Sequence, residues 1–224
     1  LASKIINRLH HFLIKKFDEC WAPDDQNNTL AGELSFCDNL GNVKYIGPIS
    51  RLERQENPEL KYDIIVVLSG PEPQRTLLES LLFKQIENTA YKVYFVRGSN
   101  IPPLYNNKHK SVEVINVLNS ETLNDKIEQS NIVICRSGYT SIMDLIKLQK
   151  KAILIPTPGQ TEQEYLATFH HERGTFLSYT QKDFKLTTAL KAADSFEWNF
   201  PKVNMEHYKL AIENLVETKL SGKL

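Results

Sequence analysis

From residue 62 onward, short apolar runs rich in β-branched residues alternate with longer segments of helical composition. The run at residues 63–68 is continuous, as expected for a strand buried on both faces. Strands that alternate with helices at this spacing predict βαβ units and a mostly parallel sheet. We therefore expect an α/β fold, with a parallel sheet that carries helices on both faces.

The same pattern locates the individual elements. Strands are predicted at residues 18–23, 44–46, 63–68, 91–96, 112–117, 132–135, 151–155 and 175–178. Helices are predicted at residues 3–16, 74–87, 123–129, 137–148, 161–171 and 205–219. Ligands bind such sheets beyond the carboxyl ends of the strands, so the loops that follow the strands are the candidate site.

The first 46 residues lack a strong apolar core of their own. We interpret residues 1–46 as the tail of a preceding domain with its linker, 47–204 as the main domain, and 205–224 as a final helix. The chain begins with Leu, so we expect it to be a piece of a longer protein. The helix at 3–16 is basic and amphipathic, so it could pack on a neighbouring sheet or contact an anionic membrane. We favour packing on a sheet.

Composition excludes several classes of protein. Lys+Arg and Asp+Glu both number 27, and this balance argues against a nucleic-acid partner. Three widely spaced cysteines fit neither a disulfide framework nor a metal cluster, which favours a reducing, cytoplasmic setting. No signal peptide and no apolar run near the ~20 residues of a membrane span is present.

Residues 132–145 concentrate the polar groups suited to a ligand. A short apolar strand ends in Arg136, Ser137 and Gly138, and Ser137 suits a helix N-cap. The start of a helix after a strand favours anions, because free N–H groups and the helix dipole both attract phosphate. Thr140, Ser141 and Asp144 lie on the polar face of that helix, and Asp144 could accept hydrogen bonds from the vicinal hydroxyls of a sugar. The alternative is a capped helix with an exposed Asp.

Two further turns carry weaker signals. Ser69 and Gly70 follow a core strand, but the two prolines after them remove backbone donors. Residues 161–164 form a predicted capping box that would occupy Glu164 structurally and leave the Gln163 amide free for sugar hydroxyls. His170 and His171 end the same helix, where the helix dipole favours a positive charge. We therefore interpret them as C-terminal helix residues and not as catalytic ones. We find no catalytic triad, metal-ligand spacing, Walker loop or nicotinamide fingerprint.

Several of these residues together resemble a known family. The similarity covers residues 44–180 and rests on Cys-Arg-Ser-Gly at 135–138, Asp-Leu at 144–145, Leu-Ile-Pro at 154–156 and Gln163 before Tyr165. The chain resembles the C-terminal, nucleotide-sugar-binding domain of family 28 glycosyltransferases, in particular members that make a lipid-linked peptidoglycan precursor. The resemblance implies the Rossmann-like C-terminal half of a GT-B fold that uses a UDP-sugar and needs no metal or other cofactor.

The resemblance also implies roles for single positions. It places the ribose at Asp144, the diphosphate at the helix start with Thr140 and Ser141, and the base at the backbone of Leu118. It further implies donor contacts from Arg51, near the diphosphate, and from Gln163 and Glu164, near the sugar. The sequence departs from the family at residues 69–73, where Ser-Gly-Pro-Glu-Pro replaces Gly-Gly-Ser-x-Gly, at Tyr139, and at Asp144, where the family has Glu.

The activity implied is that of an inverting hexosyltransferase acting on an acceptor hydroxyl, with an acceptor that could be lipid-linked. The acceptor site and catalytic base would lie in an N-terminal domain of which residues 1–46 contain only the end, and the final helix would cross back onto that domain. The chain alone is thus expected to bind donor without turnover, and its location to be cytoplasmic and peripheral to the inner membrane face. Alternatives are a donor-binding subunit with a separate partner, a nucleotide-sugar epimerase, for which the paired carboxylates are missing, and a non-catalytic nucleotide-sugar-binding module.

Overall fold

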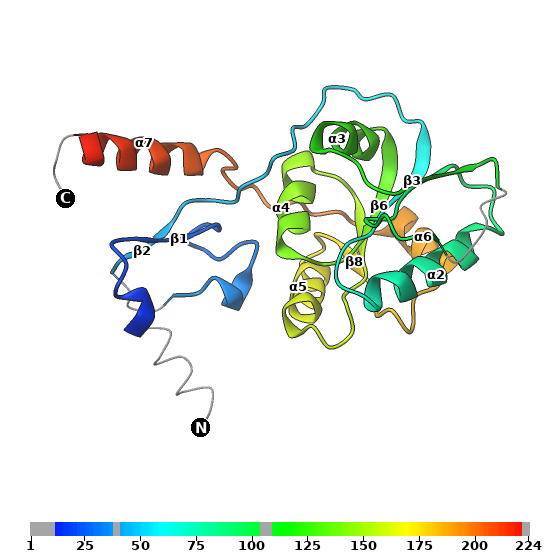
Figure 1. Ribbon diagram of the computed structural model, residues 1–224, viewed down its shortest axis with the longest axis horizontal. Helices are drawn as coiled ribbons and strands as arrows, with labels where there is room; N and C mark the ends of the chain where they lie inside the picture. The colour runs from blue at the N-terminus through cyan, green and yellow to red at the C-terminus, as the bar shows by residue number, and fades with distance from the viewer. Residues whose placement is uncertain (1–11, 38–40, 104–108, 221–224) are drawn as a thin grey trace. The chain divides into compact units, whose positions relative to one another are not determined.

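The computed structural model describes residues 12–37, 41–103 and 109–220 (Figure 1). The chain divides into two units, one formed by Ser50–Pro201 and the other by Leu1–Ile49 together with Lys202–Leu224. The sequence placed the corresponding boundaries three residues earlier and three residues later.

The larger unit is built on a parallel sheet of six strands in the order β5-β4-β3-β6-β7-β8. The strands are β3 (Tyr62–Val67), β4 (Val93–Val96), β5 (Val112–Ile115), β6 (Ser130–Cys135), β7 (Ala152–Leu154) and β8 (Leu177–Ser178). The strand order reverses between β3 and β6, where Val67 lies beside Cys135. The α/β prediction with a parallel sheet is confirmed, and the reversal marks the point where such sheets bind ligands.

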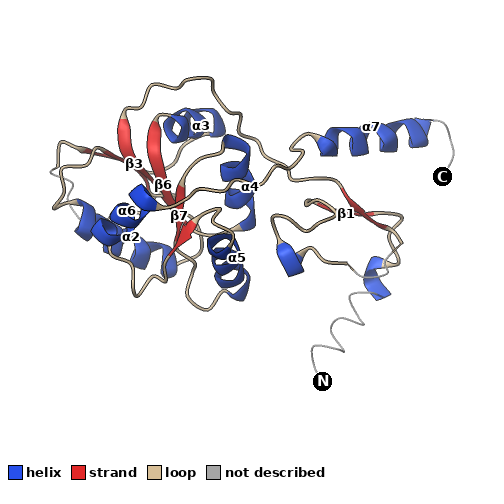
Figure 2. Ribbon diagram, turned by 180° about the vertical axis from the view of Figure 1, so that it is seen from behind, coloured by secondary structure: helices blue, strands red, loops and turns tan. Residues whose placement is uncertain are grey.

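Helices cover both faces of this sheet. They are α2 (Gln74–Ile86), α3 (Ser120–Glu128), α4 (Tyr139–Leu148), α5 (Thr161–Glu172) and α6 (Leu186–Ser195). Figures 1 and 2 show α2 and α6 on one side of the sheet and α3, α4 and α5 on the other. Alternate side chains of β3 point to opposite faces, so Ile64 and Val66 pack in the core with α2 and α6, while the equally buried Ile65 faces the other helices.

Most predicted elements are present with small shifts at their ends. Helix α3 begins three residues earlier than expected, because the side chain of Asn119 caps it by accepting the Thr122 N–H at 2.8 Å. Helix α6 was missed altogether. Its apolar residues Leu186, Ala189 and Ala193 are buried, but its N-cap is Lys185, a residue type that does not mark a helix start and makes no side-chain capping hydrogen bond here.

The smaller unit contains a parallel pair, β1 (Cys20–Ala22) and β2 (Val43–Tyr45), the 3-10 helix η1 (Gly32–Leu34) and helix α7 (His207–Leu220). The fully buried Asp24 organises the loop between the strands, accepting N–H groups of Leu30 at 3.1 Å and Ala31 at 2.8 Å. Of the helix predicted at residues 3–16, the part before residue 12 lies outside the described residues. None of the described helices combines the length and apolar character needed to cross a bilayer.

Gly98 follows β4 at a point where the backbone passes very close to another loop. Its φ is +67°, and a Cβ atom there would lie 2.3 Å from the Leu68 carbonyl oxygen. We expect Gly98→Ala to lower the free energy of unfolding by about 2 kcal/mol, through left-handed strain plus this overlap. Gly159→Ala is the matched control, because Gly159 has φ +81° with open space around it and should cost only about 1 kcal/mol. Urea titrations followed by circular dichroism would measure both, and equal losses would contradict the overlap.

Candidate functional site

The start of α4 is open and lies at the reversal of the sheet. Its N-cap is Gly138, which has φ −70° and ψ 145° and no side chain to cap the helix. A Cβ atom at Gly138 would meet nothing within 4 Å. The first N–H groups of a helix have no partner inside it and carry a partial positive charge. This helix start therefore has both the room and the electrostatics to bind an anion.

Ser137 does not cap α4, so that prediction was wrong. Its side chain is fully buried, and Oγ donates to the backbone carbonyl of Gln163 at 2.8 Å. Ser137 thus ties the loop after β6 to the first turn of α5. The prediction failed because a Ser one residue before the N-cap cannot be distinguished in the sequence from a Ser at the N-cap.

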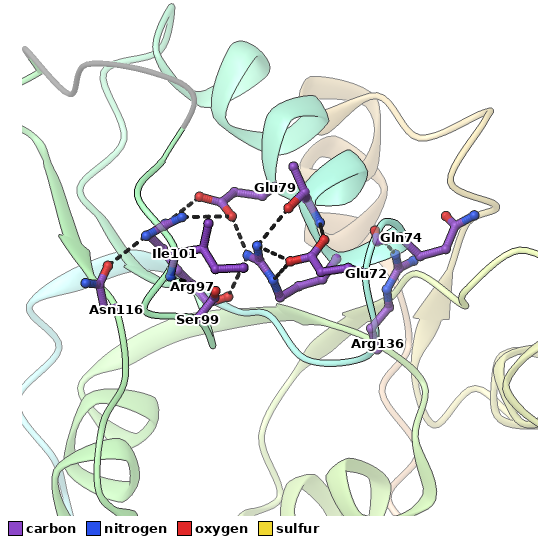
Figure 3. Close-up of polar contacts among 10 residues, drawn as sticks. Glu72, Gln74, Glu79, Arg97, Ser99, Ile101, Asn116 and Arg136 are labelled. Carbon is purple, nitrogen blue, oxygen red and sulfur yellow. Dashed lines mark hydrogen bonds and ion pairs between the residues drawn. The ribbon is translucent and has the colours of Figure 1, made fainter.

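Arg136 is buried and holds three connections together at the carboxyl edge of the sheet. Nη1 donates to the carbonyls of Ile155 at 3.2 Å and Pro156 at 3.0 Å. Nη2 donates to the carbonyl of Gln74 at 2.8 Å (Figure 3). Burial lowers the pKa of the guanidinium to about 10, so it remains charged at neutral pH. These carbonyls engage both amino groups and make Arg136 a support for the loops, while the predicted ligand contact of Arg136 would fall to Nε, which has no partner in the described residues.

Three buried polar atoms near this edge lack a hydrogen-bond partner among the described residues. They are Nε of Arg136, Oε1 of Gln74 and Oγ1 of Thr157. Buried polar atoms are nearly always paired with protein, water or ligand. The residues that follow β3, β6 and β7 therefore keep hydrogen-bonding capacity in reserve.

Asp144 and Arg51, which lie far apart in the sequence, come together beside α4. Oδ1 of Asp144 accepts from Ser50 Oγ at 2.6 Å, and the carboxylate also receives a backbone hydrogen bond from Arg51. Asp144 is half-buried, and burial raises its pKa, although Ser50 and the charge of Arg51 act in the opposite direction. The contact of Ser50 was not foreseen, since no local pattern marks that residue as a partner of Asp144.

The start of α5 differs from the predicted capping box. The N-cap is Gln160 and not Thr161, and no side chain of that residue caps the helix. Oε1 of Glu164 accepts the Gly159 N–H at 2.9 Å, and Oε1 of Gln163 accepts the Thr157 N–H at 2.9 Å. Because its oxygen must face that backbone donor, Gln163 has its NH₂ group left to donate.

The remaining predicted residues lie in loops and first turns at the same edge of the sheet. Ser69 and Gly70 are exposed in the connection from β3 to α2, and Leu118 is partly buried between β5 and α3. Thr140 is exposed and Ser141 half-buried in the first turn of α4. The topology thus gathers the predicted residues at the carboxyl ends of the strands.

Two other polar features lie outside this group. A cavity of about 550 Å³ opens at the amino ends of the strands, lined by Lys61, Tyr62, Lys92, Lys110, Ser111 and Glu113. Behind the β3–α2 loop, Arg75, Glu79 and Arg97 form a buried ion network that no local sequence pattern predicted. Within the described residues, no three His, Cys, Asp or Glu side chains are placed to hold a metal ion.

Comparison with known proteins adds family information to this geometry. The model of the glycosyltransferase family 28 C-terminal domain matches residues 64–215, more than half of the chain. A search of curated proteins found no match.

Two solved structures illustrate the similarity of the fold. The glycosyltransferase of kitacinnamycin aligns with a TM-score of 0.56 at 13% identity, covering 80% of this chain and 47% of that one. The calicheamicin glycosyltransferase CalG4 aligns with a TM-score of 0.54 at 12% identity, covering 86% and 50%. At such identities the likeness concerns the fold alone, and the chain spans about half the length of these structures.

Proposed function

This chain belongs to glycosyltransferase family 28 through its C-terminal domain, and from that premise we propose that residues 50–201 bind the nucleoside diphosphate of a nucleotide-sugar donor at the start of α4. The open helix N-terminus at Gly138 carries this proposal. The neighbouring helix α3 is closed by its own N-cap Asn119, so α4 is the better site for phosphate. Thr140 and Ser141 supply hydroxyls in the same turn.

The groups around α4 suit the other parts of such a donor. Asp144 would accept hydrogen bonds from the two ribose hydroxyls. Arg51 is exposed and lies next to Asp144, so its side chain would reach the diphosphate. The NH₂ group of Gln163 would donate to a hydroxyl of the sugar, since the oxygen of that amide already faces Thr157. The backbone around Leu118 would contact the base, and uracil is the base we propose.

The chemistry would be transfer of a hexose to an acceptor hydroxyl with inversion. As the glycosidic bond breaks, negative charge develops on the departing diphosphate, and the α4 N–H groups with Arg51 would stabilise it. This leaving-group stabilisation requires no metal. We propose that the base that activates the acceptor hydroxyl comes from outside residues 50–201, either from a further region of the protein or from a partner. We further propose a cytoplasmic enzyme that meets a lipid-linked acceptor at the membrane surface.

Gly138→Asp provides a direct test at α4. Gly138 has an extended backbone and open space, so Asp should fit and should cap the helix as well as any residue. The same carboxylate would occupy the anion site, and we expect the affinity for UDP to fall about tenfold. Isothermal titration calorimetry would measure this, with the melting temperature as a check on folding.

Gly138→Ala is the control for that experiment, because it adds only a Cβ atom without charge. We expect it to bind UDP like the unmodified chain. If Gly138→Asp bound UDP as tightly as Gly138→Ala, the diphosphate would not lie at α4 and the proposal would fail.

A further inference from the structure

Glu72 places a negative charge at the start of the other helix that faces the reversal of the sheet. It lies in the connection from β3 to α2, and its Oε2 accepts the Thr76 N–H at 3.2 Å. Its Oε1 lies 2.7 Å from Nε and 2.5 Å from Nη2 of Arg75. The carboxylate therefore receives both a first-turn backbone donor and a two-pronged guanidinium contact, the set of partners that a phosphate group would seek.

The guanidinium that holds Glu72 is fixed from behind. Nη1 of Arg75 pairs with Glu79 and donates to the carbonyl of Arg97 at 3.2 Å. Arg97 in turn contacts Glu79 through Nε at 2.5 Å and Asn116 through Nη1 at 2.8 Å (Figure 3). Arg75, Glu79 and Arg97 are nearly inaccessible to solvent, with exposures of 3%, 2% and 1%. Two arginines against one buried glutamate leave one positive charge, which Glu72 balances from the surface.

We propose that Glu72 is an internal substitute for phosphate that closes the start of α2, so that the donor diphosphate is held at α4 and not between the two helices. This inference rests on the proposed function for its consequence, but the closure of α2 can be measured independently. Pro71 and Pro73, on either side of Glu72, remove two backbone donors from the loop. A loop with so few donors is poorly suited to hold phosphate itself, whereas a carboxylate fixed by Arg75 needs none of them.

The carboxylate of Glu72 is held by several polar contacts and is also exposed to solvent. Its side chain is 41% exposed, whereas that of Arg75 is 3% exposed. The hydrogen bonds of Thr76 and the guanidinium of Arg75 keep the pKa of Glu72 below its usual value, so the carboxylate stays ionised at neutral pH. Removing it would uncover a guanidinium and a helix start that together attract anions.

Inorganic pyrophosphate is the probe that tests the closure without assuming any donor. We expect Glu72→Ala and Glu72→Gln each to raise the affinity for pyrophosphate at least fivefold by calorimetry at low salt. The matched control is Glu87→Gln, at the opposite end of the same helix, which should leave that affinity unchanged. Unchanged or weaker pyrophosphate binding by both Glu72 variants, with circular dichroism showing a folded protein, would overturn the inference.

A double variant separates this inference from the proposed function. In a Gly138→Asp background, where α4 is closed by charge, adding Glu72→Ala should restore pyrophosphate binding through α2. If Gly138→Asp does not affect UDP but Glu72→Ala still gains pyrophosphate affinity, the proposed function fails and the closure of α2 stands. If Gly138→Asp weakens UDP binding and Glu72→Ala does not raise the affinity for pyrophosphate, the closure of α2 fails and the proposed function stands.

Discussion

Replacing Asp144 with asparagine should weaken UDP binding about 30- to 150-fold, which corresponds to about 2–3 kcal/mol for two hydrogen bonds to a charged acceptor. Asparagine keeps the size of the side chain and an oxygen for Ser50 Oγ, but its amide cannot accept two ribose hydroxyls as a carboxylate does. The loss should depend on the ribose. We therefore expect 2′,3′-dideoxyuridine diphosphate, which has neither ribose hydroxyl, to bind the two proteins with similar affinity.

Ser50→Ala is the control for Asp144→Asn. It removes the 2.6 Å hydrogen bond from Ser50 while leaving the carboxylate in place. If Asp144 served only to hold the segment before β3, both variants would weaken the binding of UDP equally. Both would then also weaken the binding of the dideoxy analogue. That result in calorimetric titrations would count against a ribose contact.

The pH dependence offers an independent check on Asp144. Burial raises the pKa of this carboxyl in the folded chain. UDP affinity should therefore decline on acidification at a higher pH than an ordinary Asp would cause, as the acceptor becomes protonated, and Asp144→Asn should flatten this decline. For folding the sign is opposite: a raised pKa means that ionised Asp144 costs stability above its unfolded pKa, and that cost is relieved as pH falls. Asp144→Asn should thus not destabilise the fold at neutral pH.

Replacing Glu79 with glutamine should lower the free energy of unfolding by about 3–5 kcal/mol, the largest stability loss that we predict. Glu79 lies between Arg75 and Arg97, and all three are buried. Without its charge, two guanidiniums would share a region of low dielectric with no anion between them. Denaturant titration followed by circular dichroism would measure the loss.

Two comparisons show whether the loss comes from unpaired charge. Glu87→Gln, on the same helix but outside the network, should change stability by no more than about 0.5 kcal/mol. A triple variant with Leu at residue 79 and Met at residues 75 and 97 should recover much of the stability, because well-packed apolar residues often replace buried ion pairs without cost. If Glu79→Gln were as mild as Glu87→Gln, the network would not be the support that its geometry indicates.

Local patterns were sufficient for the framework of this protein. The β-branched run at β3 and the alternation after it predicted the parallel sheet, because side-chain periodicity directly encodes which faces are buried. The polar face of α4 likewise placed Thr140, Ser141 and Asp144 correctly on one helix. Helix α6 was not predicted, because small Ala residues give a weak apolar pattern in the sequence. They form apolar contacts only when α2 and the sheet lie beside them.

Contacts between distant segments could not be foreseen in the same way. Ser137 carries the signature of an N-cap, yet it bonds to Gln163, 26 residues away. The sequence offered no sign that the two amino groups of Arg136 would bond to carbonyls that directly follow β7 and to the first residue of α2. Charged residues such as Arg75 and Arg97 would normally be assigned to the surface, and their burial is tolerable because Glu79, between them, pairs with both.

The sequence alone determined the α/β class, the family resemblance and the edge of the sheet at which the site residues gather, because strand and helix periods and the direction of parallel strands are local properties. Tertiary structure alone decided which of those residues remain free to bind. It placed Ser50 on Asp144, turned Gln163 toward Thr157 and set Glu72 against Arg75. The physical reason is that a hydrogen bond or ion pair depends on distances of a few ångströms between groups that the chain brings together only after long connections have closed.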